Sequence, residues 1–166
     1  VHENILEREG FDLLTMGRPE GPGCYCYVNN VLRGILARLT ADYGFVVIDN
    51  EAGLEHFSRK TTRSCSRLFV VSDESPVGLK SARRIFGLVD ELGIAVEKRY
   101  LVVNRARGGV EAAPLKKDFN VSDVFIIPFD EALLEASMTA RPLGELRDSK
   151  AARGVAAIGD RICPKH

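Results

Sequence analysis

The sequence predicts an α/β fold in which helices cover both faces of a doubly wound, mostly parallel sheet. Short apolar runs alternate along the chain with longer stretches whose apolar residues recur every three or four positions. The short runs are typical of buried strands and the longer stretches of amphipathic helices. Because strands that alternate with helices usually form a parallel sheet, this order predicts the fold class. The length of 166 residues fits one domain of roughly 100 to 200 residues.

The predicted strands are apolar runs bounded by glycine or polar residues. They cover residues 11–16, 44–48, 68–71, 99–103 and 124–127. All of them are short enough for strands and are expected to be buried.

Helices are predicted between these runs. The segment 28–43 carries an apolar face at three- and four-residue spacing. A second helix begins after the cap Ser75, has Pro76 in its first position and stops at Gly93. The remaining helical stretches are 54–63, a short one after Asp130 through Glu135, and an Ala-rich one that ends at about Ile162. Residues 107–117 contain a glycine pair and a proline and are predicted as a loop.

Composition limits the classes of function. The chain is 45% hydrophobic and its 23 basic residues balance 23 acidic ones, so it carries no basic footprint for nucleic acid. No apolar run approaches the roughly 18 residues that cross a bilayer, and no signal peptide is recognised. We therefore expect a cytoplasmic protein without nucleic-acid or membrane partners, whose four cysteines do not form a disulfide framework.

A turn rich in glycine and proline, residues 17–23, precedes Cys24 and Cys26. It places two thiols at the start of the helix predicted for 28–43, where the helix dipole favours thiolate. A thiolate pair binds soft metals, and a tetrahedral site takes about four ligands. A second copy of the chain, related by a two-fold axis, would complete such a site. The alternative is that both cysteines are packing residues, as is expected for Cys65 and Cys163.

Polar residues cluster where the predicted strands end. These ends lie at Gly17, Asp49, Ser72, Asn104 and from Pro128 onward. The carboxyl ends of parallel strands share one edge of the sheet, which is the expected ligand crevice. Asp49 at this edge fits a hydrated Mg²⁺ ion, and Gly53 fits the close approach of a terminal phosphate. A plain helix cap is an equally good interpretation of Asp49.

Three segments together resemble the CooC-type accessory ATPases of carbon monoxide dehydrogenase maturation. They are Gly17-Arg18-Pro19-Glu20-Gly21-Pro22-Gly23-Cys24-x-Cys26, Val47-Ile48-Asp49-Asn50-Glu51-Ala52-Gly53-Leu54-Glu55-His56 and Val103-Asn104-Arg105. The likeness runs in order from about residue 11 to residue 130. These ATPases belong to the MinD and nitrogenase-iron-protein group of P-loop ATPases, so the resemblance implies a MinD-like P-loop fold and a site for ATP or ADP with magnesium.

The resemblance assigns the cysteines and the Asp49 turn to metal and phosphate. It implies that Cys24 and Cys26 share one nickel or zinc ion with the same pair in a homodimer. It also makes Asp49 the carboxylate on the magnesium shell and Gly53 the glycine of the second switch. The client enzyme that it implies is carbon monoxide dehydrogenase.

The resemblance assigns a second set of residues to the nucleoside. Asn104, followed by Arg105, is similar to the residue that reads the adenine edge, a role that suits an amide with both a donor and an acceptor. Pro128 and Asp130 are similar to the segment that packs beside the base and the ribose.

The chain departs from the family in one respect. No Gly-x-x-x-x-Gly-Lys-Ser/Thr sequence occurs in it, although in the family the phosphate loop precedes the region that begins near Phe11. Residues 1–166 therefore resemble a single partial domain, the C-terminal two-thirds of such an ATPase. The family places the phosphate-loop strand between segments 45–48 and 68–71, and we expect unpaired strand edges that recruit partners. Because most phosphate contacts belong to that loop, the chain is not expected to hydrolyse ATP alone.

Two other functions stay open. The first is an ATP-dependent iron–sulfur reductase like the nitrogenase iron protein, which also has a cysteine near Cys24. Its second cluster ligand would fall at His56, and this departure argues against a four-iron cluster of that type. The second is a non-catalytic module that binds a partner, in which Cys24 and Cys26 are loop residues.

Overall fold

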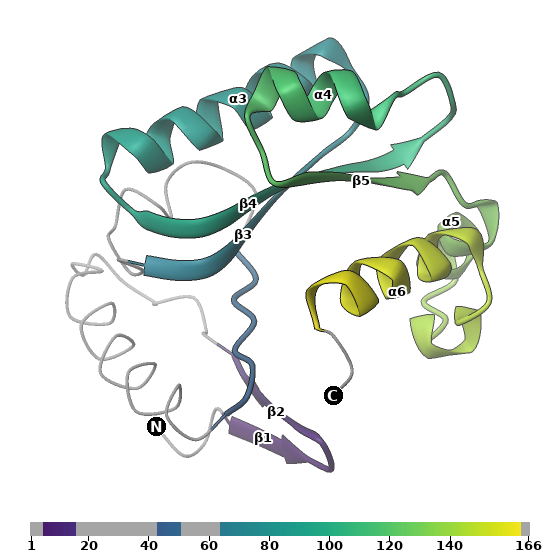
Figure 1. The fold of residues 1–166 in the computed structure, drawn as a ribbon. Coiled ribbons are helices and arrows are strands. Elements are labelled where there is room, and N and C mark those ends of the chain that lie inside the picture. The colour runs from purple at the N-terminus through teal and green to yellow at the C-terminus, as the bar shows by residue number, and fades with distance from the viewer. Residues whose placement is uncertain (1–4, 16–42, 51–63, 164–166) are drawn as a thin grey trace, which may run out of the picture. The chain divides into compact units, whose positions relative to one another are not determined.

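A computed structural model describes residues 5–15, 43–50 and 64–163 of the chain (Figure 1). The chain divides into two compact units, Val1–Asp49 and Asn50–His166. The helices predicted for 28–43 and 54–63 lie outside the described residues, apart from Tyr43. In the part of the chain that the model describes, no helix is both long and apolar enough to cross a membrane.

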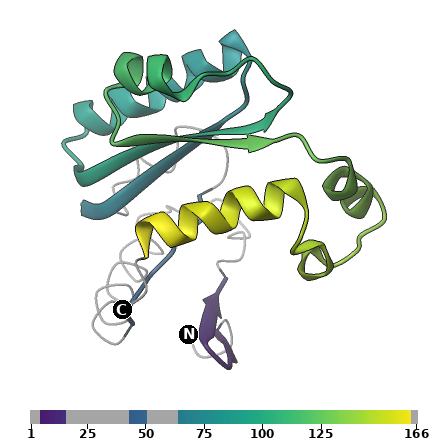
Figure 2. The same ribbon diagram turned by 45° about the vertical axis from the view of Figure 1, so that its right-hand side comes forward.

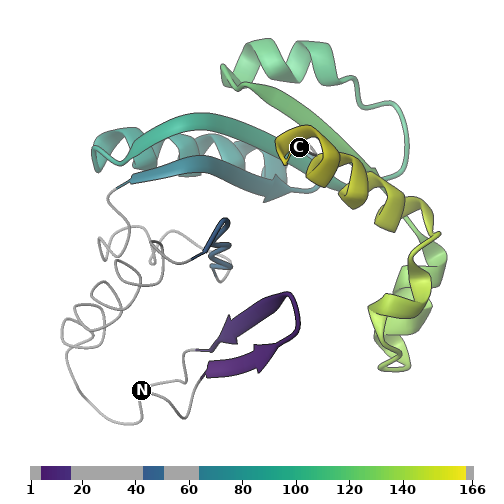
Figure 3. The ribbon, with the colours of Figure 1, turned by 60° about the horizontal axis from the view of Figure 1, so that its bottom comes forward.

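The first unit contains an antiparallel hairpin of β1 (Ile5–Arg8) and β2 (Phe11–Leu14), shown in purple in Figure 3. Arg8 lies opposite Phe11, and the tight turn between them places Gly10 at a φ of 87°, which glycine adopts without strain. The strand predicted from residue 11 is confirmed. Its predicted burial is wrong, because the Phe11 side chain is 60% exposed.

The strand predicted for residues 44–48 is wrong. This segment has no regular structure, and the side chain of Val47 is 91% exposed. An apolar run becomes a strand only when a neighbouring strand accepts its backbone hydrogen bonds. None of the strands among the described residues pairs with it.

The second unit is built on a parallel sheet of three strands. These are β3 (Ser64–Ser72), β4 (Ala95–Ala106) and β5 (Asp123–Pro128), in the spatial order β3-β4-β5. The predicted strands 68–71, 99–103 and 124–127 all lie within them. Phe69 is in register with Tyr100, and Leu101 with Val124.

Helices connect and cover the strands, as the sequence predicts. Ser75 caps α3 (Pro76–Glu91) by accepting a hydrogen bond from the backbone N–H of Gly78 at 3.0 Å. The later helices are α5 (Glu131–Met138), a short 3₁₀ turn (Leu143–Leu146) and α6 (Lys150–Ile162).

The loop predicted for 107–117 is wrong in part, because α4 (Ala112–Phe119) begins inside it. Pro114 lies in the first turn of this helix, where a backbone N–H has no partner within the helix and its loss costs nothing. Asn120 ends α4 with a φ of 50°, a left-handed conformation that asparagine tolerates.

Two cores lie on opposite faces of the sheet. On one face α3 and α4 cover β3, β4 and β5, and Leu101, Val103 and Val89 are fully buried there. On the other face α6 packs over β5, with Val102, Ile127 and Ala151 at the centre (Figure 2). The α/β prediction with helices on both faces of a parallel sheet is therefore confirmed.

Candidate functional site

The carboxyl ends of β3, β4 and β5 lie side by side at one edge of the parallel sheet. Ser72 is in register with Val103, and Ala106 is in register with Pro128. Ser72, Asn104 and Pro128 therefore share one edge, as predicted from the sequence. Gly17 lies outside the described residues, and Asp49 belongs to the first unit.

The end of β4 contains a tight turn at Arg105. Its φ is 56°, a left-handed conformation that is costly for a residue with a side chain. The side-chain oxygen of Asn104 accepts a hydrogen bond from the backbone N–H of Arg105 at 2.9 Å, which stabilises this turn. The pairing of β4 with β5 is irregular between Val103 and Ala106. Irregularities of this kind redirect side chains and are frequent next to functional sites.

Asp130 follows β5, and its carboxylate accepts hydrogen bonds from the first turns of two helices. Its Oδ1 accepts from the backbone N–H of Ala132 in α5 at 3.1 Å, and its Oδ2 accepts from the backbone N–H of Ala151 in α6 at 2.9 Å. The Ala151 N–H is the main reason that the pKa of this carboxyl is lowered, with further hydrogen bonds from Ser149, Leu133 and Ala132. The carboxylate is therefore held in one orientation by several donors.

The loops that follow the three strands are linked through Arg107. Its backbone N–H lies 3.2 and 3.1 Å from Oε1 and Oε2 of Glu74, which follows β3. Its guanidinium carbon lies 4.4 Å from the centre of the Phe129 ring, which follows β5. The backbone N–H of Phe129 donates to the carbonyl of Ala106 at 2.8 Å. The loops after β3, β4 and β5 are thus held to one another.

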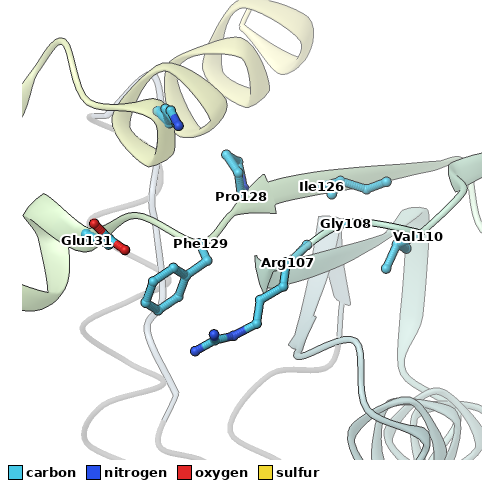
Figure 4. A pocket seen from close by; sticks show the side chains of 9 residues that line it. Arg107, Gly108, Val110, Ile126, Pro128, Phe129 and Glu131 are labelled. Carbon is cyan, nitrogen blue, oxygen red and sulfur yellow. The ribbon is translucent and has the colours of Figure 1, made fainter.

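An open hollow of about 500 Å³ lies beside these loops. Figure 4 shows the side chains of Arg107 and Phe129 extending in the same direction from neighbouring loops. The other lining residues include apolar groups at the end of β5 and two oppositely charged side chains. They are Ile126, Pro128, Glu131 and Lys150. A hollow with an aromatic ring, an apolar floor and charged groups at its rim suits a planar polar ligand.

The loop after β3 is fixed at the base of α3. Oδ1 of Asp73 accepts from the backbone N–H of Ser75 at 3.0 Å and from its hydroxyl at 2.5 Å. The Ser75 hydroxyl is the main reason that the pKa of Asp73 is lowered. A methyl group at Gly78 would overlap Oδ1 of Asp73, so any larger residue there would displace the Asp73 carboxylate.

The predicted metal and phosphate residues fall largely outside the described part of the chain. Cys24, Cys26 and Gly53 are among the residues that the model does not describe, and Asp49 lies in exposed, irregular backbone. Within segments 5–15, 43–50 and 64–163, no cluster of three or more His, Cys, Asp and Glu side chains is arranged to hold a metal ion. The described residues do not by themselves form a metal site.

The sequence did not reveal the roles of Glu74 and Arg107. The two residues are separated by 33 positions, and their contact depends on β3 and β4 being neighbours in the sheet. The signal that was available is their position, since each lies just after a strand at the ligand edge.

Comparisons with known proteins identify ATP-binding relatives, although no family model matches the chain. The chain is 38% identical to an uncharacterised ATP-binding protein of Methanocaldococcus jannaschii over 99% of its own length and 66% of the relative's. It is 30% identical to the carbon monoxide dehydrogenase accessory protein CooC of Rhodospirillum rubrum, over 96% of the chain and 62% of that protein. It is 23% identical to the septum site-determining protein MinD of Thermotoga maritima, over 80% of the chain and 52% of that protein.

The homologues are thus ATP-binding proteins of the MinD and CooC type. The parallel sheet with flanking helices is consistent with a MinD-like P-loop nucleoside-triphosphatase fold. The chain spans between about half and two-thirds of the length of the curated relatives that it matches.

Proposed function

We propose that the chain carries the base-binding part of an accessory ATPase that helps to load nickel into carbon monoxide dehydrogenase. The observation that supports this most strongly is the register of β4 and β5. Asn104 and Arg105 directly precede Ala106, whose partner is Pro128, two residues before Asp130. These are the residues that the family resemblance assigns to the nucleoside. The ATP-binding relatives, CooC among them, support the same proposal.

In this proposal the Asn104 amide reads the adenine edge. Its oxygen is already hydrogen-bonded to the Arg105 N–H, which orients the amide and keeps one lone pair and both N–H donors for the ligand. Adenine offers an exocyclic N–H donor beside a ring nitrogen acceptor, and an oriented amide pairs with both.

Pro128 and Asp130 hold the other side of the nucleoside. Pro128 supplies an apolar contact for the base at the end of β5. Asp130 accepts a hydrogen bond from a ribose hydroxyl, while its bonds to Ala132 and Ala151 hold it in place. When ATP is bound with magnesium, Asp49 and Gly53 serve the magnesium shell and the terminal phosphate.

Nickel is the cargo in this proposal. Cys24 and Cys26 of two chains hold the ion between them in a homodimer, and zinc, a similar soft cation, is the alternative occupant. The ATP-bound state of the dimer then determines when the ion is passed to carbon monoxide dehydrogenase.

Asn104 provides the test of the nucleotide site. We expect Asn104→Ala to weaken ATP binding about five- to tenfold, because a hydrogen bond to a neutral partner is worth about 1 kcal/mol. Asn104→Asp keeps an acceptor for the Arg105 N–H but loses the amide donors, so it should bind ATP as poorly. The measurement is an NMR titration of the 166-residue chain with ATP, which reports weak affinities.

Lys98→Ala is the matched control, because Lys98 is exposed at the opposite end of the same strand. It should bind ATP like the unaltered chain. Equal ATP affinity in the Asn104 variants and the control would contradict the proposed base site.

A further inference from the structure

We propose that Glu74 and Arg107 are positioning residues that set the orientation of the base-reading amide, and hence the preference for adenine over guanine nucleotides. This inference rests on the proposed function, since it concerns the same nucleotide site. Neither residue needs to touch the nucleotide. They act through the turn that contains Asn104 and Arg105.

Adenine and guanine carry their hydrogen-bond donor and acceptor in opposite positions on the base edge. Adenine offers an exocyclic N–H donor beside a ring nitrogen acceptor, whereas guanine offers a carbonyl acceptor beside a ring N–H donor. An amide that turns over by half a rotation exchanges its oxygen and its NH₂ group. Asn104 therefore discriminates between the purines only if its amide is held in one orientation.

The Asn104 amide is held by the backbone of the next residue. The oxygen of Asn104 accepts from the backbone N–H of Arg105 at 2.9 Å. The direction of this N–H is set by the peptide plane between the two residues, which belongs to the tight turn in which Arg105 has a φ of 56°. A residue with a side chain adopts this conformation only at a cost in free energy. The surrounding structure must supply that free energy if the turn is to persist.

Arg107 makes the contacts that hold the turn. Two residues after Arg105, the backbone N–H of Arg107 is shared between both carboxylate oxygens of Glu74. Glu74 is half-buried, and it follows a different strand, so it anchors the turn to the β3 loop. A hydrogen bond to a charged acceptor is stronger than one to a neutral acceptor, so this contact helps to offset the cost at Arg105.

Arg107 also contacts the loop that follows β5. The Arg107 guanidinium lies over the half-buried Phe129 ring at 4.4 Å, and the Phe129 N–H bonds to Ala106. Phe129 lies between Pro128 and Asp130 in the sequence. Arg107 therefore fixes Asn104 relative to the two residues proposed to hold the base and the ribose.

The experiment compares ATP and GTP binding to the 166-residue chain and its variants by NMR titration. For Glu74→Ala we expect the ratio of GTP to ATP dissociation constants to fall by about tenfold, because an oriented pair of hydrogen bonds is worth about 1–3 kcal/mol of discrimination. Glu74→Gln keeps one acceptor oxygen and should recover part of the ratio. The Arg107 amide should exchange with solvent faster in Glu74→Ala than in the unaltered chain.

The matched control is Glu111→Ala. This change removes an exposed carboxylate from the loop that contains Arg107, and the Glu111 side chain makes no capping hydrogen bond. Its selectivity and melting temperature should equal those of the unaltered chain. A purely structural role for Glu74 would lower the melting temperature or weaken both nucleotides equally without changing their ratio, and this result would overturn the inference.

The outcomes separate the two proposals. If the unaltered chain binds ATP and Glu74→Ala retains the full ratio, the positioning role is wrong and the proposed function stands. If the unaltered chain binds neither nucleotide while its NMR spectrum shows a folded protein, the proposed base site is wrong and the positioning role fails with it.

Discussion

Asp130 is one carboxylate on which two helices depend. It caps α5 through Ala132 and meets the first turn of α6 through Ala151, 21 residues away. The sequence predicts a polar residue at the end of β5, but only the fold shows that α6 returns to it. The nucleoside role proposed for Asp130 is therefore combined with a structural one.

Acid should destabilise the chain through this carboxylate. The pKa of Asp130 is lowered in the folded state, chiefly by the Ala151 N–H. Its contribution to stability is therefore complete above the unfolded pKa of about 4 and is lost as the pH falls through the folded pKa. Urea unfolding at about pH 7, 4.5 and 3 should show stability decreasing toward the lowest pH, and the decrease should be smaller in Asp130→Asn.

Asp160→Asn is the control for this titration, because Asp160 is exposed in the last part of α6. Its pH profile should follow that of the unaltered chain. Parallel profiles for Asp130→Asn and the unaltered chain would show that the carboxylate is not linked to folding. The pKa values of Asp73 and Asp90 are also lowered, by hydrogen bonds from Ser75 and Arg99, so these two carboxylates should contribute to the acid sensitivity that remains.

The position of a residue at the sheet edge was predictable where a local sequence pattern indicates it. Asn104 and Pro128 each follow an apolar run, and this pattern by itself indicates the edge of a parallel sheet. The contact of Glu74 with Arg107 depends on strand order, and neither neighbouring residues nor periodicity contain that information.

At the scale of elements, caps and periodicity predicted more than hydrophobicity alone. The cap Ser75, the following Pro76 and the stop at Gly93 predict α3 almost to the residue, because each satisfies or ends a known set of backbone groups. The apolar run at 44–48 has no such local signal, and its pairing depends on another strand. The helix α4 was missed because a proline in its first turn resembles a loop signal.

Two glycines in α6 provide a test of helix packing. A methyl group at Gly154 would lie 2.9 Å from Cδ1 of Ile127 in β5, whereas one at Gly159 would meet nothing within 4 Å. Gly159→Ala should raise the free energy of unfolding by about 0.5–1 kcal/mol through helix propensity. Gly154→Ala should be less stable than Gly159→Ala by about 1 kcal/mol, because the added methyl overpacks the contact with β5.

Urea denaturation measures both free energies, and Ile127→Val supplies the second half of a double-mutant cycle. This change removes the methyl group that clashes, so Gly154→Ala should cost less in its presence. Equal stabilisation by the two glycine substitutions in the unaltered background would show that α6 does not pack closely on β5.

At the scale of the whole molecule, the proposed nucleotide residues lie at a sheet edge that the structure describes. The proposed metal ligands are a cysteine pair known from the sequence alone. Asn104 and Asp130 belong to the second unit, whereas Cys24 and Cys26 belong to the first. The fold of the second unit was predictable because strands and helices alternate there with clear caps. The metal role of the cysteines stays a prediction, and it concerns the assembly of two chains.

Metal binding should double the mass of the protein species in solution, because two chains share one ion. With nickel or zinc we expect one ion per two chains and a dimer in analytical ultracentrifugation, because two cysteine pairs complete a four-thiolate site. The Cys24→Ala, Cys26→Ala double variant should lose both the ion and the dimer.

Cys65→Ala, Cys163→Ala is the matched control, since these are free thiols in the second unit; burial is the main reason that the pKa of the Cys65 thiol is raised. It should retain the metal and the dimer. Retention of one ion per dimer by the Cys24, Cys26 variant would remove the proposed metal site. A coloured iron–sulfur centre after anaerobic reconstitution would instead favour the reductase.

The placement of α6 also bears on how the chain matures during synthesis. Val102 and Ile127 are translated before α6, the helix that covers them. Until α6 has been made, these two side chains lack the cover that it supplies. The packing of α6 on the sheet therefore follows the synthesis of both strands.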